Sequence, residues 1–251
     1  ILKKMEIQLP VRCNEIGSRE SNEDTIYPAI PTKDSRLFMV CDGVGGQAKG
    51  ELASRLVCNE MASFIKDNPS RGLHDPAYWS KALEFVENTF REHLKNFPES
   101  KGMASTLSLL YIAGQEGKVQ VAWLGDSRIY HIRDGEVLYR TKDHSVVETM
   151  LDMGEITPRE ARNHPKRHII TRAINGLNPS KVDVKTIENL QENDFFMLCS
   201  DGILENIDEE KIGKMFKKEI PVEKISAMIK AEANGNTKDN YSFYLIKIDK
   251  I

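Results

Sequence analysis

Long apolar runs are missing from this sequence: no stretch reaches the roughly 18–20 residues that a helix needs to cross a bilayer. The opening residues also lack the apolar core of a secretory signal. Blocks of like charge are missing too, and 35 basic against 38 acidic side chains give a formal net charge of -3. Such a balance argues against binding to nucleic acid or to an anionic membrane. We therefore expect a soluble, cytoplasmic protein.

Cysteine is scarce, and Cys13, Cys41, Cys58 and Cys199 are spaced too widely for a zinc site. A chain of this length does not depend on disulfides, so we expect all four thiols to be reduced. The P-loop pattern Gly-Lys-Ser/Thr is absent. Internal repeats are absent as well, and 251 residues with 40% apolar composition predict a single domain over residues 1–251.

Hydrophobic spacing predicts interleaved helices and strands. Apolar residues recur at helical spacing over residues 51–65, 79–94 and 222–229. Short apolar or β-rich runs predict strands over residues 37–41, 105–112, 118–124, 195–199 and 241–248. Asp134-Gly135, between two further β-rich runs, predicts a hairpin turn. Long helices beside runs of strands indicate an α+β fold with largely antiparallel sheets.

Residues 142–176 differ from the rest of the chain, because they are polar and rich in His, Arg and Pro. Within them, Thr157-Pro158-Arg159-Glu160 fits the start of a helix, with Thr157 as the cap and Glu160 reaching back to it. We expect this segment to form a flap on the main body.

Two apolar strand patterns end in Asp-Gly, at Asp42-Gly43 and at Asp201-Gly202. Asp-Gly is typical of a hairpin turn, and Asp134-Gly135 fits that interpretation because strands flank it. It does not fit the other two, since each is followed by a helical pattern. Four more acids adjoin predicted strands or lie near the start of the chain: Asp126, Asp239 and the pair Glu23 and Asp24.

Each of these acids alone is typical of a turn or a helix cap, but together they indicate a metal site. Strand ends in one sheet system meet at a common edge, and carboxylates gathered there repel one another unless a cation lies between them. The available ligands are oxygens, including the carbonyl of Gly43, and they suit Mg²⁺ or Mn²⁺ rather than Zn²⁺. Two such ions about 4 Å apart catalyse phosphoryl transfer in many enzymes. Arg19 would supply a planar cation for the phosphate oxygens.

On these motifs the chain resembles the metal-dependent type 2C Ser/Thr protein phosphatases, especially the bacterial stand-alone kind. The matching motifs occur in family order over most of the chain: Arg19-x-x-Asn-Glu23-Asp24, Asp42-Gly-Val-Gly-Gly46, Gly102-Met-Ala-Ser-Thr106, Gly125-Asp126-Ser-Arg128, Thr141-Lys-Asp-His-Ser145, Cys199-Ser-Asp201-Gly202 and Asp239-Asn240. The resemblance implies a four-layer α-β-β-α sandwich of two antiparallel sheets flanked by helices. It also implies that residues 142–176 are the mobile flap beside the site.

The resemblance further implies a role for each acid. Asp42 is expected to bridge two ions, and Gly43 to offer its carbonyl. Asp201 and Asp239 would complete the shell of one ion, with Glu23 and Asp24 as outer contributors, partly through water. Asp126 would hold a third ion together with Asp201, and Arg19 would clamp the phosphate. The implied reaction is hydrolysis of phosphoserine and phosphothreonine in proteins, by a monomer whose partners are a Ser/Thr kinase and its targets.

One departure from the family concerns the proton donor. Eukaryotic members have a His after the first Asp-Gly, where this chain has Val44. Metal-bound water is then the first candidate for the donor, ahead of His144, His164 and His168, for which we expect ordinary surface or capping roles.

Three alternative functions stay open. Residues 43–48 fit the dinucleotide fingerprint G-x-G-x-x-A, but no acid follows at the end of a second strand, and Asp42 would repel a pyrophosphate. A catalytically inactive binding scaffold is disfavoured because the expected acids are all present. A phosphatase for a small phosphoester would use the same residues.

Overall fold

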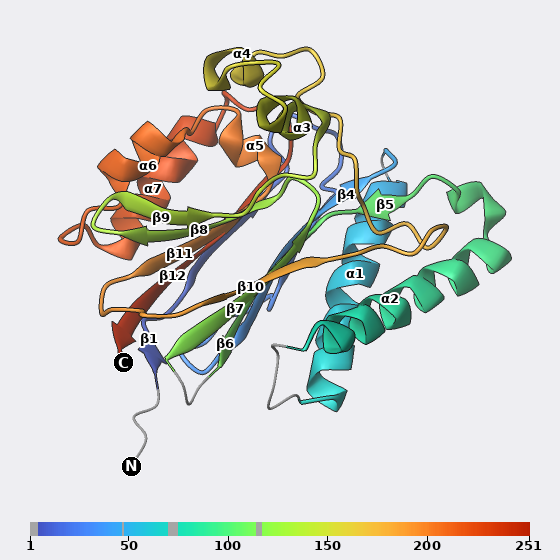
Figure 1. Ribbon diagram of the computed structural model, residues 1–251, viewed down its shortest axis with the longest axis horizontal. Helices are drawn as coiled ribbons and strands as arrows, with labels where there is room; N and C mark the ends of the chain where they lie inside the picture. Colours follow the sequence, from blue (N-terminus) through green and yellow to red (C-terminus); the bar gives the residue numbers. More distant parts are fainter. Residues whose placement is uncertain (1–4, 47, 70–74, 114–116) are drawn as a thin grey trace.

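Two six-stranded antiparallel sheets lie face to face at the centre of the molecule, and helices cover both outer faces (Figure 1). The computed structural model describes residues 5–46, 48–69, 75–113 and 117–251. The first sheet has the order β1 (Glu6–Ile7), β12 (Tyr241–Lys250), β11 (Phe195–Cys199), β8 (Arg128–Arg133) and β9 (Glu136–Arg140), with β2 (Val11–Glu15) also paired to β12. The second has the order β10 (Asp183–Ile187), β7 (Lys118–Leu124), β6 (Leu107–Ala113), β4 (Leu37–Val44) and β3 (Asp24–Tyr27), with β5 (Ala104–Ser105) paired to β4.

The helices divide between the two faces and one end of the sandwich (Figure 1). The second sheet is covered by α1 (Ala48–Asp67) and α2 (Pro76–Asn96), which leads into the short helix η1 (Pro98–Ser100). The first is covered by α5 (Asp201–Leu204), α6 (Glu209–Met215) and α7 (Val222–Ala233). Helices α3 (Val146–Asp152) and α4 (Pro158–Arg162) lie at one end of the sandwich. Across the described residues, no helix has both the length and the apolar character to cross a bilayer.

Alternation along the strands builds three separate core layers. In β11, Phe195 and Met197 pack against the helices of the first sheet, whereas Phe196 and Leu198 face the other sheet. The same period of two places Phe38 and Val40 of β4 between the sheets and points Met39 and Cys41 toward α1 and α2. A strand that is buried on both faces has a continuous apolar sequence, as β4 and β11 have.

The helix α2 shows how local sequence signals set an element and its buried face. The side chain of Asp75 caps the helix by accepting a hydrogen bond of 2.9 Å from the backbone N–H of Ala77, and Pro76 occupies the first turn. Residues Trp79, Val86 and Phe90 recur on one face and are at most 1% exposed. Their burial anchors the helix on the second sheet.

The predicted two antiparallel sheets with flanking helices are confirmed, and so is the hairpin at Asp134-Gly135. Both turn residues have positive φ, 46° and 82°, as a two-residue turn between twisted strands requires. Strands β2, β3 and β10 were not predicted, because each carries polar or charged residues at alternate positions and too few apolar ones. The division into one domain with a flap over residues 142–176 stays a prediction.

Candidate active site

A cavity of about 590 Å³ has the first residue of α5, Asp201, in its wall. Figure 1 shows α5 near α3 and α4, at the same end of the sandwich. The cavity is lined by segments that are far apart in the sequence: residues 19 and 23, the end of β4, the turn after β7, the start of α5, the loop before β12 and part of the segment after α4. The sequence predicts eight positions for the site. Seven of them line this cavity: Arg19, Glu23, Asp42, Gly43, Asp126, Asp201 and Asp239. The fold therefore brings these residues together.

Asp42 extends the row of β4 residues that faces the other sheet. Phe38 and Val40 precede it on that row, and both are fully buried. The backbone at Asp42 is held by Thr106: its N–H donates to the Thr106 hydroxyl (2.9 Å), and its carbonyl accepts from the Thr106 N–H (2.9 Å). The Thr106 hydroxyl in turn lies 2.7 Å from the hydroxyl of Ser127. These contacts fix where the carboxylate enters the cavity.

Asp24 is the sequence-predicted residue that does not line the cavity. It opposes Asp42 across the β3–β4 pair and is only 6% exposed. Its carboxylate accepts a hydrogen bond of 2.7 Å from the hydroxyl of Ser200. Burial raises the pKa of Asp24 to about 7, although the hydrogen bond from Ser200 acts in the opposite direction. Asp24 thus lies behind Asp42, between the two sheets.

Burial and neighbouring negative charges raise the pKa of two carboxylates that line the cavity, Asp42 and Asp126. Burial raises the pKa of Asp42 well above its usual range, and the negative charges of Asp24 and Asp201 raise it further. Burial likewise raises the pKa of Asp126, with Asp201 adding to the effect. The Oδ1 atom of Asp201 is buried and has no hydrogen-bond partner within the described residues. A cation placed among these groups would relieve their repulsion and satisfy that oxygen.

Two glycines allow β4, α1 and the segment before β3 to approach closely. A Cβ on Gly43 would overlap the carbonyl of Gly50 and lie 2.8 Å from the carbonyl oxygen of Glu23. A Cβ on Gly50 would overlap the carboxylate of Glu23. The N–H of Gly43 also donates to the Glu23 carbonyl (3.1 Å). Any larger residue at position 43 would push these backbones apart at the cavity wall.

Asp239 and Arg19 form an ion pair of 2.7 Å at the cavity. The loop that carries Arg19 is held by Asn240, whose amide oxygen accepts from the N–H of Glu23 (2.9 Å) and whose amide nitrogen donates to the Ser21 carbonyl (2.8 Å). The Arg19 side chain stays 54% exposed, so the guanidinium can still contact a ligand.

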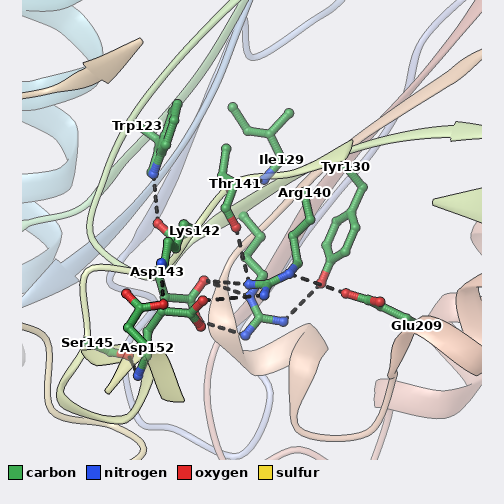
Figure 2. A network of polar contacts seen from close by, with 12 residues as sticks. Trp123, Ile129, Tyr130, Arg140, Thr141, Lys142, Asp143, Ser145, Asp152 and Glu209 are labelled. Carbon is green, nitrogen blue, oxygen red and sulfur yellow. Dashed lines mark hydrogen bonds and ion pairs between the residues drawn. The ribbon is translucent and has the colours of Figure 1, made fainter. Parts of the chain in front are cut away.

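A polar network fastens the start of the flap segment to the first sheet and to α6 (Figure 2). Arg128 donates two hydrogen bonds, of 2.8 and 2.7 Å, to the carboxylate of Asp143. Arg140 lies within 3.7 Å of Asp143, 3.5 Å of Glu148 in α3 and 3.3 Å of Glu209 in α6. Because Arg128 follows Asp126 by two residues, the network also steadies the turn that carries Asp126.

The flap segment contains the helix start that the sequence predicts. Thr157 and Glu160 form a reciprocal capping box at the beginning of α4. Farther along, Arg167, His168 and Ile170 line the cavity. The flap segment therefore forms part of the wall of the site.

The three histidines considered as proton donors have different surroundings. His144 is buried, accepts from the N–H of Gly125 at Nδ1 (3.1 Å) and lies 3.1 Å from Asp183. His164 accepts from the N–H of Lys166, a local capping contact. Within the described residues, His168 alone of the three lines the cavity, and its Nδ1 lies 3.9 Å from Asp201, whose carboxylate raises the pKa of the ring.

Several residues at the site were not predicted from the sequence. Glu205 lines the cavity four residues after Asp201, and this spacing on one helical face is a signal that could have identified it. Arg167 and Lys238 also line the cavity, but single basic residues in polar loops carry no such signal. Gln47, within the glycine-rich segment that resembles a dinucleotide fingerprint, lies outside the described residues.

The donor set suits a hard divalent cation. Among the side chains that the structure describes, no three of Asp, Glu, His and Cys already form a compact metal-binding cluster. Mg²⁺ and similar ions use one or two carboxylates and retain several waters, so a cavity lined by oxygen donors accommodates them without an all-protein shell. The buried Oδ1 of Asp201 and the raised pKa values of Asp42 and Asp126 fit such an occupant.

Comparison with known proteins gives consistent matches. The family model described as Protein phosphatase 2C matches residues 14–232. Serine/threonine protein phosphatase PstP of Mycobacterium tuberculosis is 33% identical over 224 residues, which are 88% of this chain but 41% of that protein. Protein phosphatase PhpP of Streptococcus pneumoniae is 28% identical over 248 residues, 98% of both chains. The crystal structure of the PstP catalytic domain in complex with 2 manganese ions superposes with a TM-score of 0.81 at 29% identity, covering 98% of this chain and 100% of that one.

Proposed function

The chain belongs to the protein phosphatase 2C family, and on this premise we propose that it hydrolyses phosphoserine and phosphothreonine in proteins with the help of Mn²⁺ or Mg²⁺. The observation that carries the proposal is the convergence of six carboxylates on one cavity: Glu23, Asp42, Asp126, Asp201, Glu205 and Asp239. Such a density of negative charge is costly without a cation. The manganese ions of the PstP catalytic domain support the choice of metal.

Particular residues would hold the ions. Asp42, at the end of β4, would be shared between two ions, with the Gly43 carbonyl beside it. Asp201 and Asp239 would complete one shell, and Asp126 with Asp201 would hold a third, weaker ion. Glu23 at the wall and Asp24 behind Asp42 would act as outer contributors, partly through water. Bound divalent ions supply Lewis acidity for the phosphate and lower the pKa of the attacking water.

The remaining chemistry falls to the chain's own residues. Arg19 would orient the phosphate, because its guanidinium is planar, always charged and half-exposed at the cavity. The buried side chains of Thr106 and Ser127 would hold the backbone of Asp42 in place, so that its carboxylate keeps a fixed position relative to the phosphate. Val44 is 41% exposed at the cavity and offers no proton, so solvent is the first candidate for the proton donor, ahead of the cavity-lining His168.

The partners of this activity are inferred from the family. We expect the substrates to include a Ser/Thr kinase and its targets, and the chain to act as a monomer in the cytoplasm. The four cysteines are free and buried, which fits a reducing compartment. A small phosphoester as the main substrate and an inactive scaffold are the alternatives that the first experiment separates.

Metal removal tests the proposal. A chelator is expected to lower kcat/KM for a phosphothreonine peptide by at least about 100-fold, and added Mn²⁺ should restore it. Thermal unfolding gives a second measurement, because ions that bind only the folded state raise Tm with their concentration. Full activity in chelator would contradict the metal mechanism. Turnover of small phosphomonoesters but of no phosphopeptide would favour the small-substrate alternative, and a metal-dependent Tm without any turnover would favour the scaffold.

Replacement of Arg19 by Ala tests the phosphate clamp. We expect KM for a phosphopeptide to rise about tenfold with kcat changed less than about threefold, because a clamp contacts the phosphate before and during the reaction alike. Arg55→Ala, which removes an exposed arginine of α1 paired with Glu51, is the matched control. A loss confined to kcat would show that Arg19 acts in the transition state instead.

A further inference from the structure

Two basic side chains at the cavity have no role in the chemistry proposed above. Arg167, in the segment after α4, and Lys238, in the loop before β12, both line the cavity and are both exposed. Within the described part of the chain, neither side chain forms an ion pair or a hydrogen bond, in spite of the six carboxylates that line the same cavity. Their charges are therefore available to a ligand.

The other basic groups of the cavity are already engaged. Arg19 is paired with Asp239 at 2.7 Å, and His168 lies 3.9 Å from Asp201. These two carboxylates are also the ones that the proposed function assigns to a metal ion. Arg167 directly precedes His168, and Lys238 directly precedes Asp239, so the two unpaired cations line the cavity from two different segments.

We propose that Arg167 and Lys238 form a subsite for a second negative charge on the substrate, a carboxylate or a second phosphate close in sequence to the phosphorylated residue. The inference rests on the proposed function and specifies its substrate class. A residue adjacent to the phosphorylated one, or two positions away, lies within about 7 Å of it along an extended peptide, which is within reach of a long basic side chain. Val44 and Ile170 supply apolar surface in the same cavity for the peptide between the two anions.

Electrostatics favour a peptide over a longer polyanion as the occupant. The chain has a net charge of -3, and six carboxylates line the cavity beside these two cations. A nucleic acid would bring many phosphates past those carboxylates and meet two free cations among the described residues of the cavity, whereas a peptide brings one extra anion to them. Because both side chains are exposed, their attraction is expected to weaken as salt is added.

The test uses one phosphothreonine peptide in three versions, with Gln, Glu or phosphoserine at the positions flanking the phosphothreonine. With Mn²⁺ at low salt, we expect kcat/KM for the Glu peptide to exceed that for the Gln peptide about tenfold, and the ratio to fall toward one near 0.5 M salt. R167Q and K238Q should each lower the ratio about threefold, and the double variant should bring it close to one. The phosphoserine version shows which anion the subsite takes.

K218Q is the matched control, since Lys218 is an exposed lysine beside the Asp134-Gly135 turn and contacts that turn through its backbone N–H. It should keep the wild-type ratio. A wild-type ratio of one, with chelator-sensitive hydrolysis of all three peptides, would overturn the subsite and leave the proposed function standing. An undiminished ratio in the double variant would also overturn it. Hydrolysis of none of the peptides would be a different result, because the proposed function would then fail together with this inference.

Discussion

Replacement of Asp201 by Asn is expected to lower kcat/KM for an aryl phosphate by about 10³-fold, the scale of loss when one charge-stabilising group is removed from a transition state. The reason lies in the position of this carboxylate. One of its oxygens is buried without a partner among the described residues, and its charge raises the pKa of both Asp42 and Asp126. An amide has the same shape but brings no charge to a cation.

The same substitution should not weaken the fold. In chelator, loss of one of several mutually repelling carboxylates should leave the free energy of unfolding unchanged or raise it by about 1 kcal/mol. With Mn²⁺, the wild-type Tm should rise and that of the variant should rise less. Steady-state kinetics and thermal unfolding with and without Mn²⁺ check both statements.

Asp34→Asn is the matched control for Asp201→Asn, because Asp34 is exposed in the loop before β4, away from the cavity. This variant should behave as wild type in both measurements. If Asp201→Asn kept normal activity, the assignment of metal ligands at this end of the sandwich would be wrong. If it lost activity but destabilised the chelated protein by several kcal/mol, the carboxylate would be a structural group instead.

Much of the fold could be predicted from local patterns. The apolar runs in β4 and β11 and the helical spacing in α2 identify elements buried on one or both faces, and Asp134-Gly135 identifies a turn. Strands such as β3, with its four residues, carry too little apolar signal, and their pairing is set by neighbours far away in the sequence. Tertiary context decides such segments.

The site was predictable where acids adjoin strand ends, as at Asp42 and Asp239. The burial of Asp24 was not predictable, because its hydrogen-bond partner Ser200 lies 176 positions away and neither local sequence indicates that the two residues meet. The positions of Arg167 and Lys238 at the cavity could not be predicted from the sequence either. Exposed basic residues occur along the whole chain, and their place at the cavity follows only from the path of the loops.

Replacement of Gly43 by Ala is the substitution for which we expect the largest loss of stability. Its Cβ would overlap the carbonyl of Gly50 and lie 2.8 Å from that of Glu23, so two backbone segments would have to separate. Overpacking of this kind is expected to cost about 3 kcal/mol. Since Asp42 precedes Gly43, kcat/KM should also fall at least about 100-fold, as expected for a displacement of about 1 Å at a reacting centre.

Gly154→Ala separates this steric overlap from simple backbone strain. Gly154 follows α3 with φ of +69°, and a Cβ there would meet no atom within 4 Å, so its replacement should cost only about 1 kcal/mol. Denaturant unfolding of both variants measures the difference, and near-UV circular dichroism shows whether Gly43→Ala keeps its tertiary packing. Equal costs at the two positions would mean that β4, α1 and the Glu23 segment do not meet as closely as the site requires. A larger cost at Gly43, with a weakened rise in Tm on addition of Mn²⁺, would tie that close packing to the metal site itself.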